Sequence, residues 1–149
     1  MELVSKLGSE NKQIRIDALH ELKAEIDAGK IEKPVMGTDV NNHIHSVYSF
    51  SPYTPSAAVW MAYNSGLCTA GIMDHDTICG AEEFIEAASI IGIASTIGSE
   101  MRADMSGTPL EGRRINNPDQ KGIAYVALHG IPHTQIKRVS EFFKPLNKA

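Results

Sequence analysis

The sequence predicts an α/β fold in which parallel strands alternate with helices, preceded by an N-terminal helix. Short apolar segments with the length of strands alternate with longer helical patterns after Pro34. These strand segments are nearly continuous in apolar residues, which is typical of parallel strands covered by helices. With 149 residues, of which 42% are hydrophobic and 21% charged, the chain is long enough to bury one core. We therefore divide it into an N-terminal helical segment, residues 1–34, and an α/β portion, residues 35–149.

The N-terminal segment is predicted to form an amphipathic helix from about Gly8 to Gly29. Gly29 is a residue type at which helices often end. His20 lies beside the apolar stripe, and we expect it to be structural or solvated. The stripe itself recurs every four residues, with one addition that widens it, and consists of Ile14, Ala18, Leu19, Leu22 and Ile26.

The α/β portion is predicted to contain four strands and three helices. Thr54 is the expected N-cap of the first of these helices, with Pro55 at its first position. A polar segment, residues 101–122, precedes the last strand, and it is predicted to be an active-site lid, a small hairpin or a disordered excursion. We expect strands at 40–46, 69–73, 93–97 and 123–128, and helices at 55–66, 80–91 and 132–148.

The overall charge and the cysteines indicate which partners and which cell compartment to expect. The formal net charge of -4 gives no electrostatic reason to expect nucleic acid or a membrane as a partner. The two cysteines, Cys68 and Cys79, are expected to be free thiols in a reducing compartment. We find no signal peptide and no apolar stretch long enough to span a bilayer, so the expected location is the cytoplasm.

Ionisable residues gather at the ends of the predicted strands. Loops that leave the carboxyl edge of a parallel sheet converge there, so we expect these side chains to lie close together. In order along the chain, they are His43 and His45 toward the end of the first strand, Asp74, His75 and Asp76 directly after the second, Glu100 after the third and His129 after the fourth.

These residue types are suited to holding metal ions. Residues at i and i+2 of a strand point the same way, so His43 and His45 can reach one metal. Glu100 has two carboxylate oxygens, which can bind separate cations. Imidazole nitrogens and carboxylate oxygens together favour Zn, Mn or Fe over Mg or Ca alone. Asp74 could orient His75 or join the coordination sphere, and Asp76 could cap the next helix or take part in the chemistry.

Three motifs, in this order and spacing, resemble the PHP (polymerase and histidinol phosphatase) domain. That family has a His-x-His strand end, an Asp-His-Asp strand end and a Gly-x-Glu strand end. The resemblance covers about residues 38–102. Its motifs here are Asn42-His43-Ile44-His45, then Gly71-Ile72-Met73-Asp74-His75-Asp76-Thr77, then Ile97-Gly98-Ser99-Glu100.

The resemblance implies a partial (β/α) barrel with two or three divalent metal ions, Zn, Mn or Fe, at the strand ends. His43, His45 and His75 match its histidine ligands. Glu100 matches the carboxylate that bridges metals, and His129 corresponds less closely to a later histidine ligand. The activity that the resemblance implies is metal-dependent hydrolysis of a phosphate ester by a metal-activated water.

The sequence departs from the family pattern at three places. Asn41 stands where the family often has aspartate, and Ser49-Phe50-Ser51 stands where many members have Ser-Asp-Gly. The closing Asp-x-His has no counterpart before Ala149, and a complete barrel needs about 250 residues. We therefore expect the chain to be the first part of a longer protein and, as a fragment with an open sheet edge, to self-associate.

The functional expectation is a phosphoesterase that acts on a small-molecule phosphate ester. Asp74 and Glu100 are its candidate catalytic carboxylates. Arg102, Arg113 and Arg114 are candidates for binding the phosphate.

Two alternatives remain open. One is a metal-binding or assembly module without turnover, because the late ligands are absent. The other is a different metallohydrolase barrel that opens with His-x-His and acts on amide or ring C–N bonds. Ser-His-Asp catalysis is not expected, since the sequence has no Gly-x-Ser-x-Gly turn.

Overall fold

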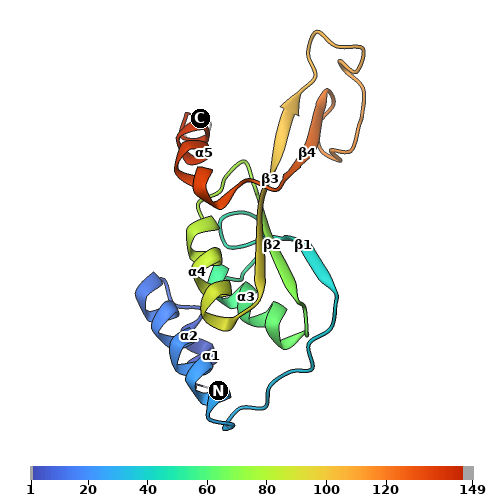
Figure 1. Ribbon diagram of the computed structural model, residues 1–149. Helices are drawn as coiled ribbons and strands as arrows, with labels where there is room; N and C mark the ends of the chain where they lie inside the picture. Colours follow the sequence, from blue (N-terminus) through green and yellow to red (C-terminus); the bar gives the residue numbers. More distant parts are fainter. Residues whose placement is uncertain (1, 146–149) are drawn as a thin grey trace.

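The computed structural model describes residues 2–145 and has the helices on one side of a single sheet (Figure 1). No helix within this range is both long and apolar enough to cross a membrane. The elements are α1 (Glu2–Lys6), α2 (Lys12–Asp27), β1 (Val40–Ile44), α3 (Pro55–Asn64), β2 (Thr69–His75), α4 (Ala81–Ile91), β3 (Ala94–Asp104), β4 (Ile123–His129), the 3-10 turn η1 (His133–Gln135) and α5 (Ile136–Phe143).

The sheet is curled, has the order β1-β2-β3-β4, and is mostly parallel, which confirms the predicted α/β class with a partial barrel and a leading helix. β1, β2 and β3 run parallel, but β4 pairs with β3 in the antiparallel direction. The expectation of four parallel strands is therefore wrong for β4. A parallel partner needs a crossover connection, whereas β4 follows β3 directly through a hairpin.

The polar segment before β4 is the tip of this hairpin. β3 continues to Asp104, which pairs with Ile123, so residues 105–122 form the turn region. Figure 1 shows the hairpin as an arm that projects away from the helices. Asn116 stabilises the arm, because its side chain bonds both the backbone N–H and the C=O of Tyr125, at 2.9 Å each. Of the three predicted possibilities for this segment, the hairpin is the one observed.

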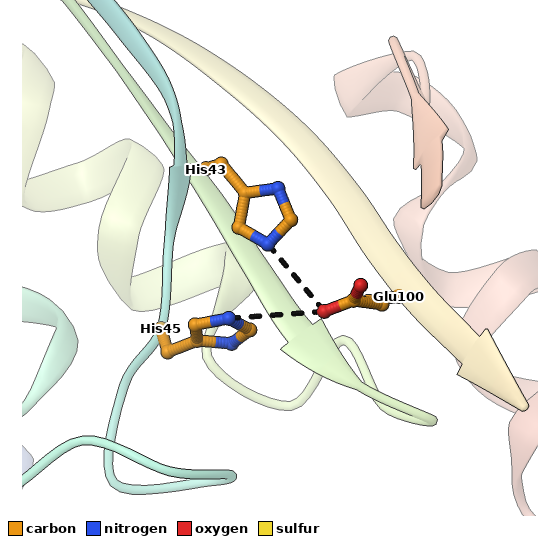
Figure 2. Close-up of side chains that lie close together, drawn as sticks. All are labelled: His43, His45 and Glu100. Atoms are coloured by element: carbon orange, nitrogen blue, oxygen red, sulfur yellow. Dashed lines mark ion pairs between the residues drawn. The ribbon is translucent and has the colours of Figure 1, made fainter. Parts of the chain in front are cut away.

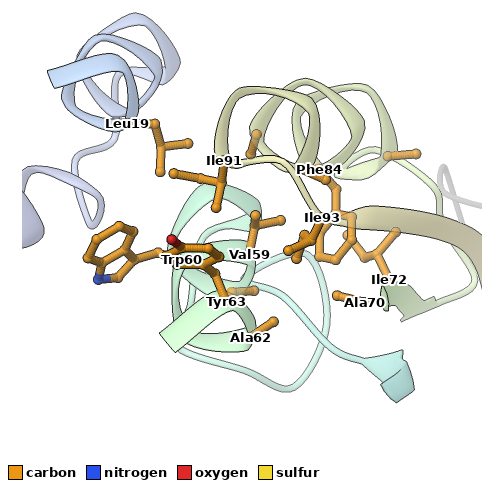
Figure 3. Close-up of a cluster of buried hydrophobic side chains, with 14 of the residues drawn as sticks. Leu19, Val59, Trp60, Ala62, Tyr63, Ala70, Ile72, Phe84, Ile91 and Ile93 are labelled. Atoms are coloured by element: carbon orange, nitrogen blue, oxygen red, sulfur yellow. The ribbon is translucent and has the colours of Figure 1, made fainter. Parts of the chain in front are cut away.

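The hydrophobic core lies between the sheet and the helices α3 and α4, and it continues between these two helices and α2 (Figure 3). The predicted N-cap is confirmed, because Thr54 Oγ1 accepts a hydrogen bond from the Ala57 amide at 3.1 Å. The apolar stripe predicted for the helix that is now α2 is wrong at Ile14, because this side chain is 43% exposed. The core members that Figure 3 labels are Leu19, Val59, Trp60, Ala62, Tyr63, Ala70, Ile72, Phe84, Ile91 and Ile93.

On α2 the buried side chain at the start of the stripe is Arg15, where the sequence pattern predicted Ile14. Its guanidinium forms a buried ion pair with Glu83 of α4. Ser56, in the first turn of α3, donates to the same carboxylate from its hydroxyl at 2.7 Å and from its amide at 3.2 Å. The N-terminal segment 1–34 is therefore tied to both helices that cover the sheet, and it shares their core.

The last predicted helix begins with the 3-10 turn η1 and continues as α5 to Phe143. The buried residues of α5 are Ile136 and Phe143. The part of that prediction beyond residue 145 lies outside the described residues.

Candidate metal centre

The strand register brings the motif residues to the sheet face that the helices leave open. Side chains alternate between the two faces of a strand. Ile72 and Ile97 are paired neighbours that point into the helical core. Three positions further along each strand, His75 and Glu100 are paired on the opposite face. His75 is the last residue of β2, and β3 continues past Glu100 into the arm.

Three imidazoles converge on one carboxylate oxygen. Oε2 of Glu100 lies 3.1 Å from Nε2 of His75, 3.4 Å from Nε2 of His43 and 3.8 Å from Nε2 of His45. Figure 2 shows two of these contacts, with His43 and His45 reaching from the β1 segment across β2 toward β3. Residues far apart in the sequence thus place four potential ligands together, as the motif spacing predicted.

The imidazole rings also contact one another. His45 stacks on His75 with ring centroids 4.9 Å apart, and His43 meets the edge of His45 at 5.0 Å. Burial, followed by the neighbouring imidazoles of His75 and His43, lowers the pKa of His45 below its usual value of 6.5. This lowering favours the neutral imidazole of His45, which is the form that binds a metal ion.

His129 lies near this cluster but outside it. It ends β4 and pairs with Gly98, because the antiparallel strand returns toward the start of β3. Its ring is 6.4 Å from that of His43, and its side chain is exposed. The structure brings together the predicted ligands of the first three strands and leaves His129 at their margin.

Asp74 points to the other face of the sheet and is only 1% exposed. Its carboxylate accepts hydrogen bonds from the Ser46 amide and hydroxyl, both at 2.6 Å, and from the Ser49 hydroxyl at 2.7 Å. These contacts replace the predicted roles of orienting His75 or joining the coordination sphere. Sequence reasoning missed Ser46 and Ser49. The signals were the position of Ser46 directly after the His-x-His motif and the place of Ser49 where many members of the PHP family have the serine of Ser-Asp-Gly.

Asp76 holds Arg102 and does not cap a helix. The N-cap of α4 is Gly80, which makes no side-chain capping bond, so the capping interpretation is wrong. Asp76 has a φ of 52°, a left-handed conformation that aspartate tolerates better than most residues. Its carboxylate accepts from the Arg102 amide at 3.0 Å and from Arg102 Nε at 2.5 Å.

A hollow of about 230 Å³ opens beside His75 and Arg102. Phe50 and Tyr125 each meet His75 edge-on, with ring centroids 4.7 and 5.2 Å away. The wall of the hollow is therefore shared with the imidazole cluster. Its lining consists of Tyr48, Ser49, Phe50, His75, Asp76, Arg102 and Tyr125.

The other two predicted phosphate-binding residues lie in the arm. Arg113 and Arg114 belong to the turn region beyond Asp104, and Arg114 donates a hydrogen bond to the Pro118 carbonyl. Asp104, the last residue of β3, is roughly 14 Å along the strand from Glu100, at about 3.4 Å per residue. Both arginines follow Asp104 in the turn region. Arg102 is therefore the one of the three arginines that the structure places at the site.

The donor atoms fit a divalent metal ion. Ligand atoms of His43, His45 and Glu100 all lie within 4.8 Å of one another. His75 is not part of this group of three, but its Nε2 contacts the same Glu100 oxygen. Ligands of a tetrahedral zinc ion, at about 2.0–2.1 Å from the metal, are about 3.4 Å apart. The contacts of 3.1, 3.4 and 3.8 Å lie close to that spacing. An imidazole and carboxylate donor set suits Zn, Mn or Fe.

Comparison with known proteins gives partial matches. No protein-family model matches the chain. The error-prone DNA polymerases of Mycobacterium tuberculosis and Mycobacterium bovis are 34% identical over 82 residues, which is 54% of this chain and 7% of each polymerase. A 5'-3' exoribonuclease of Haemophilus influenzae is 35% identical over 65 residues, or 44% of this chain and 24% of that enzyme.

A crystal structure from Bifidobacterium adolescentis, of a protein assigned as a metal-dependent phosphoesterase, is 31% identical. It matches 66% of this chain and 27% of that one, with a TM-score of 0.41. The chain thus spans a small part of the relatives that it matches. The similarity to the polymerases, which have a PHP domain, confirms the resemblance that the three motifs had indicated.

Proposed function

We propose that this protein is a metal-dependent phosphoesterase that hydrolyses a small-molecule phosphate ester. The observation that carries the proposal is the convergence of three Nε2 atoms, from His43, His45 and His75, on one oxygen of Glu100. Two or three divalent cations, Zn, Mn or Fe, are the proposed cofactors. When bound, such cations lower the pKa of a coordinated water and hold the phosphoryl oxygens for in-line attack.

The protein side chains have separate roles in this proposal. His43, His45 and His75 supply nitrogen ligands, and Glu100 supplies a carboxylate whose two oxygens can bind separate cations. Glu100 is only 18% exposed at its side chain, so the charge is partly shielded from water and attracts cations strongly. His129 is a candidate for an outer ligand that a small movement of its exposed side chain would bring in.

The hollow beside His75 is the proposed site for the organic part of the ester. Asp76 fixes Arg102 through Nε, which leaves the two terminal nitrogens of the guanidinium to bind a phosphate or carboxylate oxygen. Phe50 and Tyr125 line the hollow next to His75 and offer aromatic surface to the organic part of the ester. A small phosphate ester with a planar group fits a hollow of about 230 Å³ lined in this way.

The test combines metal analysis with hydrolysis of a generic aryl phosphate by the purified protein. We expect bound or added Zn or Mn to support hydrolysis, and His45→Ala to abolish most of it. His20→Ala on the surface of α2 is the matched control, because His20 is exposed and lies outside the cluster. Activity of His45→Ala equal to that of the unaltered protein would remove the mechanism.

Two further outcomes of the same assay separate the remaining alternatives. Two relatives are named for acting on nucleic acids, so an oligonucleotide with a terminal phosphate should be assayed beside the aryl phosphate. The net charge of -4 favours the small molecule. Stoichiometric metal binding without hydrolysis of either compound would favour a non-catalytic metal-binding module. That alternative is consistent with the single group of three ligands found among residues 2–145.

A further inference from the structure

A chain of hydrogen bonds connects the buried Asp74 to the imidazole of His45. Asp74 Oδ1 accepts from the Ser49 hydroxyl at 2.7 Å, and Ser49 Oγ lies 3.2 Å from His45 Nδ1. The turn that carries Ser49 is itself fixed, since the Ser49 amide donates to the Ser46 carbonyl at 3.0 Å. Ser46 donates to Asp74 from both its amide and its hydroxyl. The position of Ser49 Oγ is therefore determined by protein contacts.

Counting the protons in this chain settles which atom donates to which. A carboxylate can only accept, so the single hydroxyl proton of Ser49 goes to Asp74. Ser49 Oγ has no second proton, so it can only accept a hydrogen bond from His45. Consequently His45 Nδ1 must carry the proton in their contact. In a neutral imidazole the other nitrogen is then unprotonated, and in His45 that nitrogen is Nε2, which faces Glu100.

We infer that Ser49 and Asp74 are positioning residues that hold His45 in the tautomer with Nδ1 protonated and the Nε2 lone pair directed into the metal centre. Asp74 therefore acts through Ser49, without contacting the reacting atoms. The consequence for cation binding rests on the proposed function, whereas the tautomer itself does not. Such outer partners of ligating histidines raise metal affinity by about 10- to 100-fold.

The first test reads the tautomer directly in metal-free protein. Ring nitrogen chemical shifts of His45, measured by NMR at about pH 8 where a histidine of ordinary pKa is neutral, distinguish the protonated from the unprotonated nitrogen. We expect a protonated Nδ1 in the unaltered protein. In Ser49→Ala we expect a mixture that includes protonated Nε2. The inference is overturned if the unaltered protein carries the proton on Nε2, or if Ser49→Ala leaves the tautomer unchanged.

The second test measures cation affinity by calorimetric titration with Zn. We expect Ser49→Ala to weaken binding by about 10- to 100-fold and Ser49→Thr, which keeps the hydroxyl, to restore it. Ser51→Ala is the matched control in the same loop, because the Ser51 hydroxyl accepts from the Tyr53 amide and lies outside this chain of hydrogen bonds. Equal loss in Ser49→Ala and Ser51→Ala would overturn the inference and indicate a general effect on the loop.

The two tests also separate this inference from the proposed function. Absence of cation binding in the unaltered protein, with the Nδ1-protonated tautomer present and sensitive to Ser49→Ala, would refute the phosphoesterase proposal and support the positioning of His45. Cation binding and hydrolysis that are unaffected by Ser49→Ala would support the phosphoesterase and refute the positioning role.

Discussion

The guanidinium of Arg15 on α2 is paired with the carboxylate of Glu83 on α4, and their side chains are only 7% and 5% exposed. Breaking a buried ion pair on one side leaves the other charge desolvated and without a partner. We therefore expect Arg15→Ala to lower the free energy of unfolding by about 3–5 kcal/mol, measured by denaturant titration.

The control for this prediction is on the same helix. Lys12 pairs with Glu86, but those side chains are 48% and 46% exposed. Exposed pairs contribute about 0–1 kcal/mol, so Lys12→Ala should change stability little. Comparable losses from Arg15→Ala and Lys12→Ala would show that the Arg15–Glu83 pair does not anchor the N-terminal helix.

The same carboxylate predicts a dependence of stability on pH. Burial opposes ionisation of Glu83, but the hydrogen bonds from Arg15 and Ser56 outweigh it and hold its pKa below the usual value of 4.5. The unfolded chain thus takes up this proton first as the pH falls. The stabilisation is complete above about pH 4.5 and is lost as the pH falls through the lower, folded pKa. In Glu83→Gln we expect a shallower fall of melting temperature with acidification, and an unchanged slope would contradict the assignment.

Glu100 is expected to couple metal binding to stability. A ligand that binds only the folded state adds about 2.7 kcal/mol at a concentration 100 times its Kd. Added Zn or Mn should therefore raise the melting temperature of the unaltered protein. Glu100→Gln keeps the shape of the side chain and removes the charge that meets His43, His45 and His75. We expect it to lose most of this rise, and calorimetry with and without metal measures the difference.

A variant outside the site makes this measurement specific. Glu111 lies in the arm and is exposed, so Glu111→Gln removes the same charge far from the cluster. Its metal-dependent rise should equal that of the unaltered protein. If Glu100→Gln retains the full rise, the cations bind elsewhere.

The order and type of the first elements could be predicted because local signals and burial agreed. Thr54 and Pro55 marked the start of α3, where Thr54 is the N-cap and Pro55 the first helical residue. The direction of β4 could not be predicted in this way. The polar residues 101–122 left a lid, a small hairpin and a disordered excursion open, and the pairing of Asp104 with Ile123 depends on contacts between residues far apart in the sequence.

The convergence of the candidate ligands could be predicted for a similar reason, and the contacts that support them could not. His43, His45, His75 and Glu100 belong to short motifs whose spacing reflects the two-residue period of strands. Asp74 and His75 are neighbours in the same motif, yet they point to opposite faces of β2, so proximity in sequence was misleading for Asp74. The Asp76–Arg102 pair requires two strand ends to be adjacent, which only the register reveals.

Arg102 is expected to bind substrate, and the two arginines of the arm are not. A hydrogen bond to a charged group contributes about 1.5–3 kcal/mol, and the 58% exposure of Arg102 places its effect at the lower end. Arg102→Ala should therefore lower kcat/KM for an aryl phosphate by about tenfold, mainly through KM. Arg102→Lys should not restore it, because lysine lacks the Nε–H that Asp76 holds and the fork that remains free.

Arg114→Ala provides the comparison, since Arg114 is held by the Pro118 carbonyl in the arm. Its kinetics should match those of the unaltered protein. The positions of the two residues make the contrast informative: Arg102 lines the hollow with His75, whereas Arg114 lies beyond the end of β3. If Arg114→Ala lowers kcat/KM as much as Arg102→Ala does, the ester binds along the arm and the hollow beside His75 is not its site.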